Sequence, residues 1–473
     1  MKTISFSIKH ALGFLLAVLM VVSSCKKLDE TPLSFVSPDD FYTTPAQVEA
    51  VFASAMNSLW DAWSAYGYAM VYFSNDDQLN GGDLNIPANW ASDLWAAHYA
   101  AILNLNTAIG SIEKGSLKGT PQDAVDQLIG QAKFLRAYNY FMLVRMFGGL
   151  PLLTEAEKDP FHAQIARSSV EDVYQLIVAD FTEAIAKLPA SWPKAQQGRP
   201  TMDVAKALLA KAYLTMATYP LHKPENYQKA AELAGEVIQD GRYHLVTDIN
   251  DVFSVATKYG PEMMWSFNSN YNDMATDPHI WSDMQGWGDE SADPIWVDKY
   301  PEQPRKYAYI QTEFDGEDYK TLGKLPGIKK YLYDTPEDFD AGRSIINIPI
   351  MRYADVLLIY AEAENMSKGG PTPDAVKYLN QVIDRANGYQ INPADPQANT
   401  SMSQTAFDTK VIQERNLELC FEYDRWFDLI RKHMLKEASN PDIQQNFSED
   451  DYLFPIPEND VRLNPMLTQN PGY

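Results

Sequence analysis

The sequence predicts a mostly α-helical fold, in which a scaffold of paired helices is interrupted by one large irregular excursion. Apolar residues recur at i, i+3, i+4 and i+7 through most of the chain, which is the spacing of a helix face packed on a core. Several of these stretches begin at a capping residue followed by proline. Between residues 241 and 348 the periodicity is lost, and the chain is rich in Pro, Gly, Asp, Asn and aromatic residues.

Cap signals and apolar faces locate four helices in the first part of the chain. A capping residue can accept a hydrogen bond from a free backbone N–H, and glycine commonly ends a helix. The second helix is recognised by its apolar face alone, from Trp95 to Ile112. The other expected boundaries are Thr44-Pro45 for the start of the first helix, Thr120-Pro121 and Gly148-Gly149 for the third, and a Ser168–Glu171 capping box for the fourth.

Later helices are expected near residues 202–218, 226–239, 350–367, 373–387 and 405–436. Two of them are rich in alanine and are joined by a short turn, which allows close antiparallel packing. They are similar to tetratricopeptide helix pairs, although no fixed repeat period is kept. We therefore expect a repeat-like scaffold rather than a regular solenoid.

The N-terminus has the pattern of a lipoprotein signal peptide. Lys2 and Lys9 precede an uncharged apolar stretch, Ala11–Val22, which is too short to cross about 30 Å of hydrocarbon. Small residues then lead to Cys25, whose thiol is the expected site of lipid attachment. The sequence thus predicts a signal peptide over residues 1–24 and a chain tethered to a membrane surface.

Composition narrows the function classes. With 39 Lys and Arg against 63 Asp and Glu, the formal net charge is −24, so a nucleic-acid partner is not expected. No cofactor motif and no metal-ligand spacing is found.

After the signal peptide, we expect residues 25–240 and 241–473 to form one compact unit. The second of these regions is expected to have a loop-rich part at 241–348, a helical part at 349–436 and a tail at 437–473.

Eight of the ten tryptophans fall in two blocks, residues 60–95 and 265–296. An indole ring is flat and apolar and can cover the C–H face of a sugar ring, while amides and carboxylates bind its hydroxyls. Trp60, Trp95 and Trp296 are assigned to the core. The expected ligand contacts, on the irregular 75–90 and 271–296 segments, are Trp287, Trp281, Trp90, Tyr271, Asn89, Asp76 and Asp77.

The 76–87 stretch does not complete a calcium loop. Asp76 and Asn80 have the required spacing, but Pro87 stands where a bidentate acid belongs. The structural alternative for this segment is a solvated turn. In the last helices, Glu414, Glu418 and Arg415 are expected to form structural ion pairs.

At this point the chain resembles the SusD/RagB family. The matching segments follow the family's order and are 132–138 (AKFLRAY), 147–152 (FGGLPL), 348–358 (IPIMRYADVLL), 360–363 (YAEA), 414–429, 452–457 (YLFPIP), 463–465 (LNP) and 469–473 (QNPGY). One departure occurs at Gln303, where members often carry an acid two residues before the arginine that is Arg305 here. The resemblance covers nearly all of the chain after the signal peptide.

The resemblance implies a surface-exposed, outer-membrane lipoprotein of Bacteroidetes-type bacteria on a tetratricopeptide-like scaffold. It implies a protein that binds oligosaccharides or other nutrients, without catalysis, and passes them to a SusC-like TonB-dependent transporter. Two alternatives stay open. One is a secreted glycoside hydrolase, for which Asp283 and Glu290 are the candidate carboxylates. The other is a structural subunit that acts as a lid on the transporter.

Overall fold

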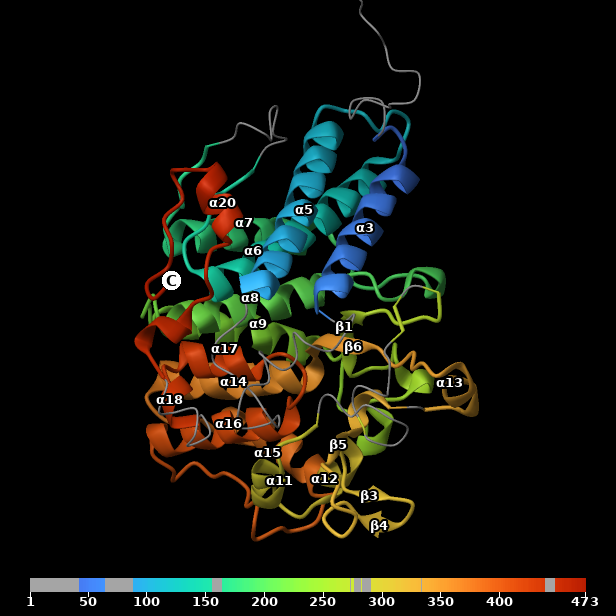
Figure 1. Ribbon diagram of the computed structural model, residues 1–473, viewed down its shortest axis with the longest axis vertical. Helices are drawn as coiled ribbons and strands as arrows, with labels where there is room; N and C mark the ends of the chain where they lie inside the picture. Colours follow the sequence, from blue (N-terminus) through green and yellow to red (C-terminus); the bar gives the residue numbers. More distant parts are fainter. Residues whose placement is uncertain are drawn as a thin grey trace, which may run out of the picture. The chain divides into compact units, whose positions relative to one another are not determined.

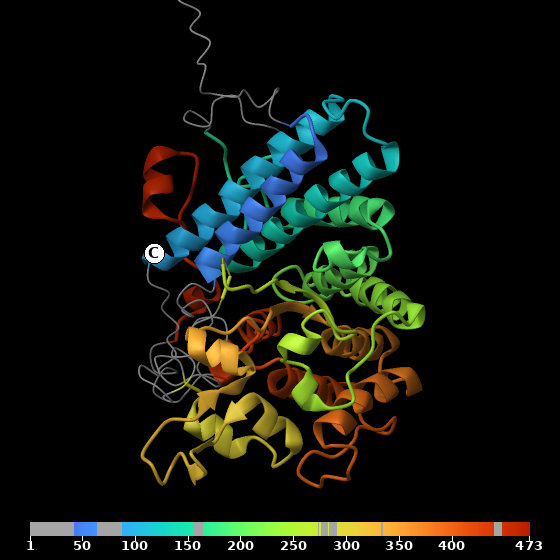
Figure 2. The ribbon, with the colours of Figure 1, turned by 90° about the vertical axis from the view of Figure 1, so that its right-hand side faces the viewer.

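A computed structural model of the chain describes residues 42–63, 88–154, 164–272, 274–275, 282, 291–332, 334–438 and 447–473. Within this part, most residues lie in helices that pack on one another in succession (Figures 1 and 2). The expected helical scaffold is therefore confirmed. Its main helices are α3 (Pro45–Trp63), α5 (Ala88–Glu113), α6 (Gln122–Phe147), α7 (Val170–Lys187), α8 (Met202–Ala217), α9 (Asn226–Asp240), α14 (Tyr353–Lys368), α15 (Pro373–Ala386) and α16 (Gln404–Glu418).

The packing order joins segments that are distant in sequence. Each helix from α3 to α9 contacts the next one along the chain, and α9 then contacts α14, on which both α15 and α16 pack. Residues 241–352 lie between α9 and α14 in sequence but do not separate them in space. The irregular excursion therefore leaves the helical stack and returns to it at nearly the same place.

The predicted helix boundaries hold where a local cap decides them. Helix α3 begins at Pro45 with the Thr44 hydroxyl accepting from the Gln47 N–H at 3.4 Å, and α6 ends at Gly148, whose φ is 73°. The expected Ser168–Glu171 capping box is wrong by one residue. Ser169 caps α7, accepting from the Asp172 N–H at 3.1 Å, because the backbone of Ser168 pairs with that of Leu150.

The two late helices differ from the prediction at their ends. The segment expected to be helical from residue 350 is first a strand, β6 (Ile348–Arg352), and α14 begins only at Tyr353. The long helix expected over 405–436 is three pieces: α16, α17 (Arg425–Arg431) and α18 (Leu435–Ala438). Between α16 and α17 the backbone turns, with positive φ at Phe421 and Tyr423.

The excursion contains short elements connected by loops. They are η2 (Ile249–Asp251), η3 (Val255–Thr257), β1 (Met263–Phe267), α11 (Pro294–Lys299), α12 (Pro304–Tyr309), β2 (Ile310–Gln311), β3 (Glu313–Phe314), β4 (Glu317–Asp318), β5 (Gly327–Ile328), η4 (Lys329–Tyr331) and α13 (Pro336–Ala341). Strand β2 pairs with β5, and β3 with β4, both antiparallel. The remaining short helices are η1 (Lys194–Gln196), η5 (Glu449–Tyr452) and α20 (Glu458–Leu463).

The antiparallel pair β1–β6 closes the base of the excursion. Phe267 lies opposite Ile348, so the chain leaves and re-enters the scaffold through one two-stranded ladder. The buried side chain of Asn347 reinforces this closure: its amide nitrogen donates to the Ser266 hydroxyl and the Lys258 carbonyl at 3.0 Å, and its oxygen accepts from the Ser269 N–H at 2.9 Å. The ends of the excursion are therefore fixed to each other.

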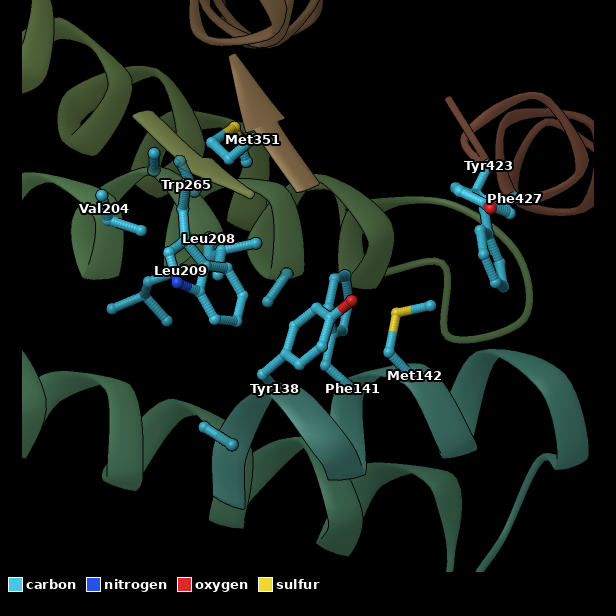
Figure 3. Close-up of a cluster of buried hydrophobic side chains, with 14 of the residues drawn as sticks. Tyr138, Phe141, Met142, Val204, Leu208, Leu209, Trp265, Met351, Tyr423 and Phe427 are labelled. Carbon is cyan, nitrogen blue, oxygen red and sulfur yellow. The ribbon is translucent and has the colours of Figure 1, made fainter. Parts of the chain in front are cut away.

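Strand β1 also places an indole in the core between the excursion and the helices (Figure 3). The Trp265 ring is buried and stands edge-on to Tyr138, with ring centroids 4.9 Å apart, and to Phe134 at 4.7 Å. Such edge-to-face pairs add to the free energy of burying the rings. This tryptophan of the second block is structural.

A buried group of charges fastens the excursion to the last helices. We call it the Glu418 cluster, and its members are Glu262, Glu414, Glu418, Glu422, Arg305, Lys330, Arg352 and Arg385. Glu418 is at its centre, within 2.8 Å of Arg385, 2.9 Å of Arg305 and 3.0 Å of Arg352. Since Arg305 and Lys330 belong to the excursion and the glutamates at 414–422 lie at the end of α16, these ion pairs connect the two parts.

At the centre of the cluster, the electrostatics favour a charged Glu418 despite its complete burial. Burial alone would raise the pKa of Glu418, but Arg385, Arg352 and Arg305 outweigh it and hold that pKa well below its ordinary value.

The prediction that Glu414, Glu418 and Arg415 form structural ion pairs is confirmed. Glu414 and Glu418 pair with Arg305, and Arg415 pairs with Asp355 and Asp428. Gln303 stands where family members often carry an acid. Arg305 pairs instead with Glu414 and Glu418 of α16.

No helix in the described part of the chain is long and apolar enough to cross a membrane.

We expect Glu418→Gln to lower the free energy of unfolding by about 3–5 kcal/mol, because three buried guanidinium groups would lose their common counter-charge. The measurement is urea unfolding followed by circular dichroism. The matched control is Asp298→Asn, which removes an exposed ion pair with Lys320 and should cost less than about 1 kcal/mol. Equal, small effects of both variants would contradict the structural role of the cluster.

Candidate functional site

Two elements that precede the segments assigned to ligand binding, α3 before 75–90 and β1 before 271–296, meet at their C-terminal ends. Trp60, near the end of α3, contacts Phe267, the last residue of β1, with ring centroids 5.6 Å apart. In sequence, residues 64–87 follow α3 and residues 268–290 follow β1, so the chain leaves both elements at this contact. The lower end of α3 lies next to β1 in Figure 1.

Trp90 and Asn89 lie in the first turn of α5, not in a loop. The helix starts directly after Pro87, which is why a segment that looks irregular in sequence is already helical at residue 88. The Trp90 ring is half-buried against the hydrophobic core. The side chain of Asn89 lies outside the described residues. Part of the Trp90 ring is exposed, and its contact with a ligand stays a prediction.

Tyr271 is the predicted site residue whose surroundings the structure defines best. Its ring is half-buried, and its hydroxyl donates a hydrogen bond of 2.6 Å to the Asp338 carboxylate. This bond raises the pKa of Tyr271 to about 12, because the neutral phenol donates to the carboxylate and the phenolate cannot. Asp338 is buried and also accepts from the backbone N–H groups of Asp334 and Thr335, at 3.2 and 3.1 Å. The ring of Tyr271 is therefore held in a fixed orientation at the start of the second segment.

The far side of the second segment is also anchored. The Ser282 hydroxyl donates to the Gln311 side-chain oxygen at 2.5 Å, and the Ala292 N–H donates to the Pro326 carbonyl at 2.9 Å. Asp293 caps α11, accepting from the N–H groups of Ile295 and Trp296. The chain on both sides of the tryptophan-rich stretch is thus attached to ordered structure.

Several predicted residues lie outside the described part of the chain. They are Cys25, Asp76, Asp77, Trp281 and Trp287, together with Asp283 and Glu290 of the hydrolase alternative. Their assignments stay predictions. The expected core tryptophans are confirmed: Trp60 and Trp95 are each 4% exposed, and Trp296 is 8% exposed.

The structure also contains a hollow that the sequence did not indicate. Its volume is about 800 Å³, and it lies within the excursion, bordered by η2, α12 and strands β2 and β3. Tyr307 is on its wall, with 49% of its surface exposed. The only sequence signal for it is the aromatic content of the irregular 241–348 region. Among the described residues, no group of three His, Cys, Asp or Glu side chains is placed to hold a metal ion.

Two family models match the chain, one in its N-terminal half and one in its C-terminal half. The model described as "Starch-binding associating with outer membrane" matches residues 39–214, and the model described as "SusD family" matches residues 263–473. The chain belongs to the SusD/RagB family. The resemblance inferred from the motifs is thereby confirmed over both halves.

Known relatives agree over the full length. A SusD-like protein P2 of Formosa agariphila is 27% identical, over 98% of this chain and 100% of its own. A SusD superfamily protein of Parabacteroides distasonis has the same fold, with a TM-score of 0.79, 24% identity and coverage of 90% of this chain and 99% of its own. A laminarin-binding SusD-like protein superposes with a TM-score of 0.73 and 22% identity, over 91% of this chain and 100% of its own.

Tyr271→Phe should lower the free energy of unfolding by about 1 kcal/mol, because Asp338 would lose a hydrogen-bond donor. The amides of residues 334–338 should exchange with solvent faster, measured by hydrogen exchange. Tyr389→Phe is the control, since the Tyr389 hydroxyl makes no hydrogen bond among the described residues. The assignment fails if both variants exchange like the wild type.

Proposed function

We propose that this protein is a cell-surface lipoprotein that binds oligosaccharides without modifying them. The observation that carries the proposal is that α3 and β1, the elements that precede the two tryptophan-bearing segments (75–90 and 271–296), meet at the Trp60–Phe267 contact. Because the chain leaves both elements there, side chains of one segment can face the same ligand as side chains of the other. The family relation supports the same function, since a SusD-like relative is named for laminarin binding.

The proposed binding surface combines stacking with hydrogen bonds. Trp287, Trp281, Trp90 and Tyr271 would cover sugar rings with their faces, and Asn89, Asp76 and Asp77 would accept from or donate to the hydroxyls. Rigid attachment of the flanking chain favours binding, because less conformational freedom is lost when the ligand is covered. Tyr271, fixed on Asp338, is the described example of such a preorganised side chain.

The location and partner of the protein follow from the N-terminus and the family. We propose that Cys25 carries the lipid anchor after removal of residues 1–24, and that the anchor holds the protein at the outer membrane. Burial of more than one acyl chain makes such attachment stable. We further propose that the regions 25–240 and 241–473 act as one unit, which passes its ligand to a SusC-like TonB-dependent transporter.

Trp287→Ala should weaken binding of the preferred oligosaccharide about tenfold, because an exposed indole supplies much of the stacking energy. Calorimetric titration of the full chain in detergent, with a panel of neutral oligosaccharides, measures this. Trp426→Phe is the control, since Trp426 is a buried tryptophan that is not among the proposed ligand contacts. Absence of any glycan binding, or release of reducing ends that Asp283→Asn abolishes, would refute the proposal in favour of the hydrolase. Oligosaccharide binding that occurs only when the transporter is present would favour the alternative of a structural lid subunit.

Cys25→Ala should release the protein from the membrane fraction, because the alanine side chain cannot be acylated. Metabolic labelling with a fatty-acid analogue and fractionation of cells provide the measurement. Cys420→Ala is the control, since that thiol is buried and should not affect labelling. Undiminished labelling of the Cys25 variant would disprove lipidation at this residue.

A further inference from the structure

Two neighbouring hollows in the excursion share part of their walls. The first, of about 800 Å³, has Tyr307 on its wall, and the second, of about 610 Å³, has Tyr389 on its wall. Ile249 and Asn250 of η2 line both hollows. We call the two together the Tyr307–Tyr389 groove. A ligand that fills it must be elongated, because two adjoining spaces of this size exceed what a single sugar ring needs.

Both tyrosine rings are open to a ligand. Tyr307 is 49% exposed and Tyr389 is 56% exposed, and neither ring stacks on another aromatic ring among the described residues. The walls of ligand sites are commonly formed by such aromatic faces, and the phenol ring can cover the C–H face of a sugar. The groove therefore presents an uncovered flat apolar surface in each of its two hollows.

A side-chain bond holds the Tyr307 ring in position, and backbone bonds fix the chain at both tyrosines. The Tyr307 hydroxyl donates to the Glu302 carboxylate, and the Tyr307 carbonyl accepts from the Lys329 ammonium at 2.9 Å. Tyr389 has a φ of 61°, a left-handed conformation that bulky residues rarely adopt, and its N–H donates to the Asp384 carbonyl at 2.7 Å. Such strained residues persist where the surrounding structure holds them, and they occur often at binding sites.

Polar groups on the wall of the first hollow are left without partners. The Glu313 carboxylate makes no hydrogen bond or ion pair among the residues that the structure describes, and neither does the Thr312 hydroxyl. Gln311 uses its side-chain oxygen to accept from Ser282 and leaves its amide N–H groups unbonded. Gly327 makes room for this amide, because a Cβ there would lie 2.8 Å from the Gln311 oxygen. The wall of the first hollow thus offers an acceptor at Glu313 and a donor at Gln311.

The charges along the groove select against an anionic ligand. Carboxylates of Asp248, Asp251, Glu313 and Asp334 line it. Of the two cations, Arg385 is already neutralised by its glutamates, and Lys329 is bound to a carbonyl. A sulfated or uronic-acid polymer would be repelled, whereas the hydroxyls of a neutral sugar can donate to carboxylates.

We propose that the Tyr307–Tyr389 groove is a second binding site, which takes a linear neutral oligosaccharide separately from the tryptophan-bearing segments. The proposal rests on the proposed function, since it assigns a further site for the same class of ligand. The two sites adjoin, because Ser282 of the second tryptophan-bearing segment bonds to Gln311 in the groove. One long glycan chain can then contact both surfaces, and joint contact raises the overall affinity.

The test removes the first site and asks whether binding remains in the groove. The full chain in detergent is titrated by calorimetry with maltohexaose, laminarihexaose, cellohexaose and mannohexaose. Four forms are compared: the wild type, Trp287→Ala, Trp287→Ala with Tyr307→Ala and Tyr389→Ala, and Trp287→Ala with Tyr259→Ala. Tyr259 is a matched control, because it is an exposed tyrosine of the excursion that does not line the groove.

We expect residual binding in Trp287→Ala, a further loss of about tenfold on removal of the two groove tyrosines, and no further loss with Tyr259→Ala. The groove site is refuted, and the proposed function is not, if Trp287→Ala alone abolishes binding. It is refuted in the same way if the variant that also lacks the two groove tyrosines binds with the same affinity as Trp287→Ala. No binding by the wild type refutes both.

Labelling with 3-fluorotyrosine provides a readout that does not depend on the stability of the variants. The fluorine resonances of Tyr307 and Tyr389, assigned with Tyr307→Phe and Tyr389→Phe, should shift when the wild type or Trp287→Ala is saturated with the best hexasaccharide. Unmoved resonances at saturation would overturn the groove site even if the variants failed to fold.

Discussion

The architecture depends on buried opposite charges in the Glu418 cluster. Burying ions in a protein costs several kcal/mol each, and only good geometry with several partners compensates for it. Here one carboxylate is shared by three arginines that come from different parts of the sequence, so the charges are satisfied only when those parts are correctly placed. A hydrophobic contact would tolerate small displacements, whereas this arrangement does not. The cluster thereby fixes the irregular excursion on the helices and gives its loops a rigid base.

Features with local causes could be predicted from the sequence. The start of α3 at Pro45 and the end of α6 at Gly148 follow from residues within one turn of the boundary. The helical periodicity likewise predicted which faces are buried, and it correctly placed Trp60 and Trp95 in the core. The family resemblance added the order of the elements and the class of function.

Features with non-local causes could not be predicted. The break between α16 and α17 contains no glycine or proline. It arises because Lys330 donates to the carbonyls of Glu418 and Cys420, and Tyr331 to that of Phe421, all from about 90 residues away in sequence. The Tyr307–Tyr389 groove is of the same kind, since its two hollows are brought together along η2 only by the tertiary fold. Most of the residues proposed to bind ligand on the tryptophan-bearing segments lie outside the described part of the chain. Their assignment to the binding surface therefore rests on the sequence.

The ladder between β1 and β6 has an evolutionary consequence. Since Phe267 and Ile348 are paired, and Arg305 and Lys330 are bound to the last helices, the loops between these fixed points can gain or lose residues without moving the helices on either side. Lengthening a loop whose ends are already joined adds little entropic cost, about 0.6 kcal/mol for each doubling. Relatives that keep these fixed points can therefore acquire new specificities by exchanging the loops between them while the supporting frame is inherited unchanged.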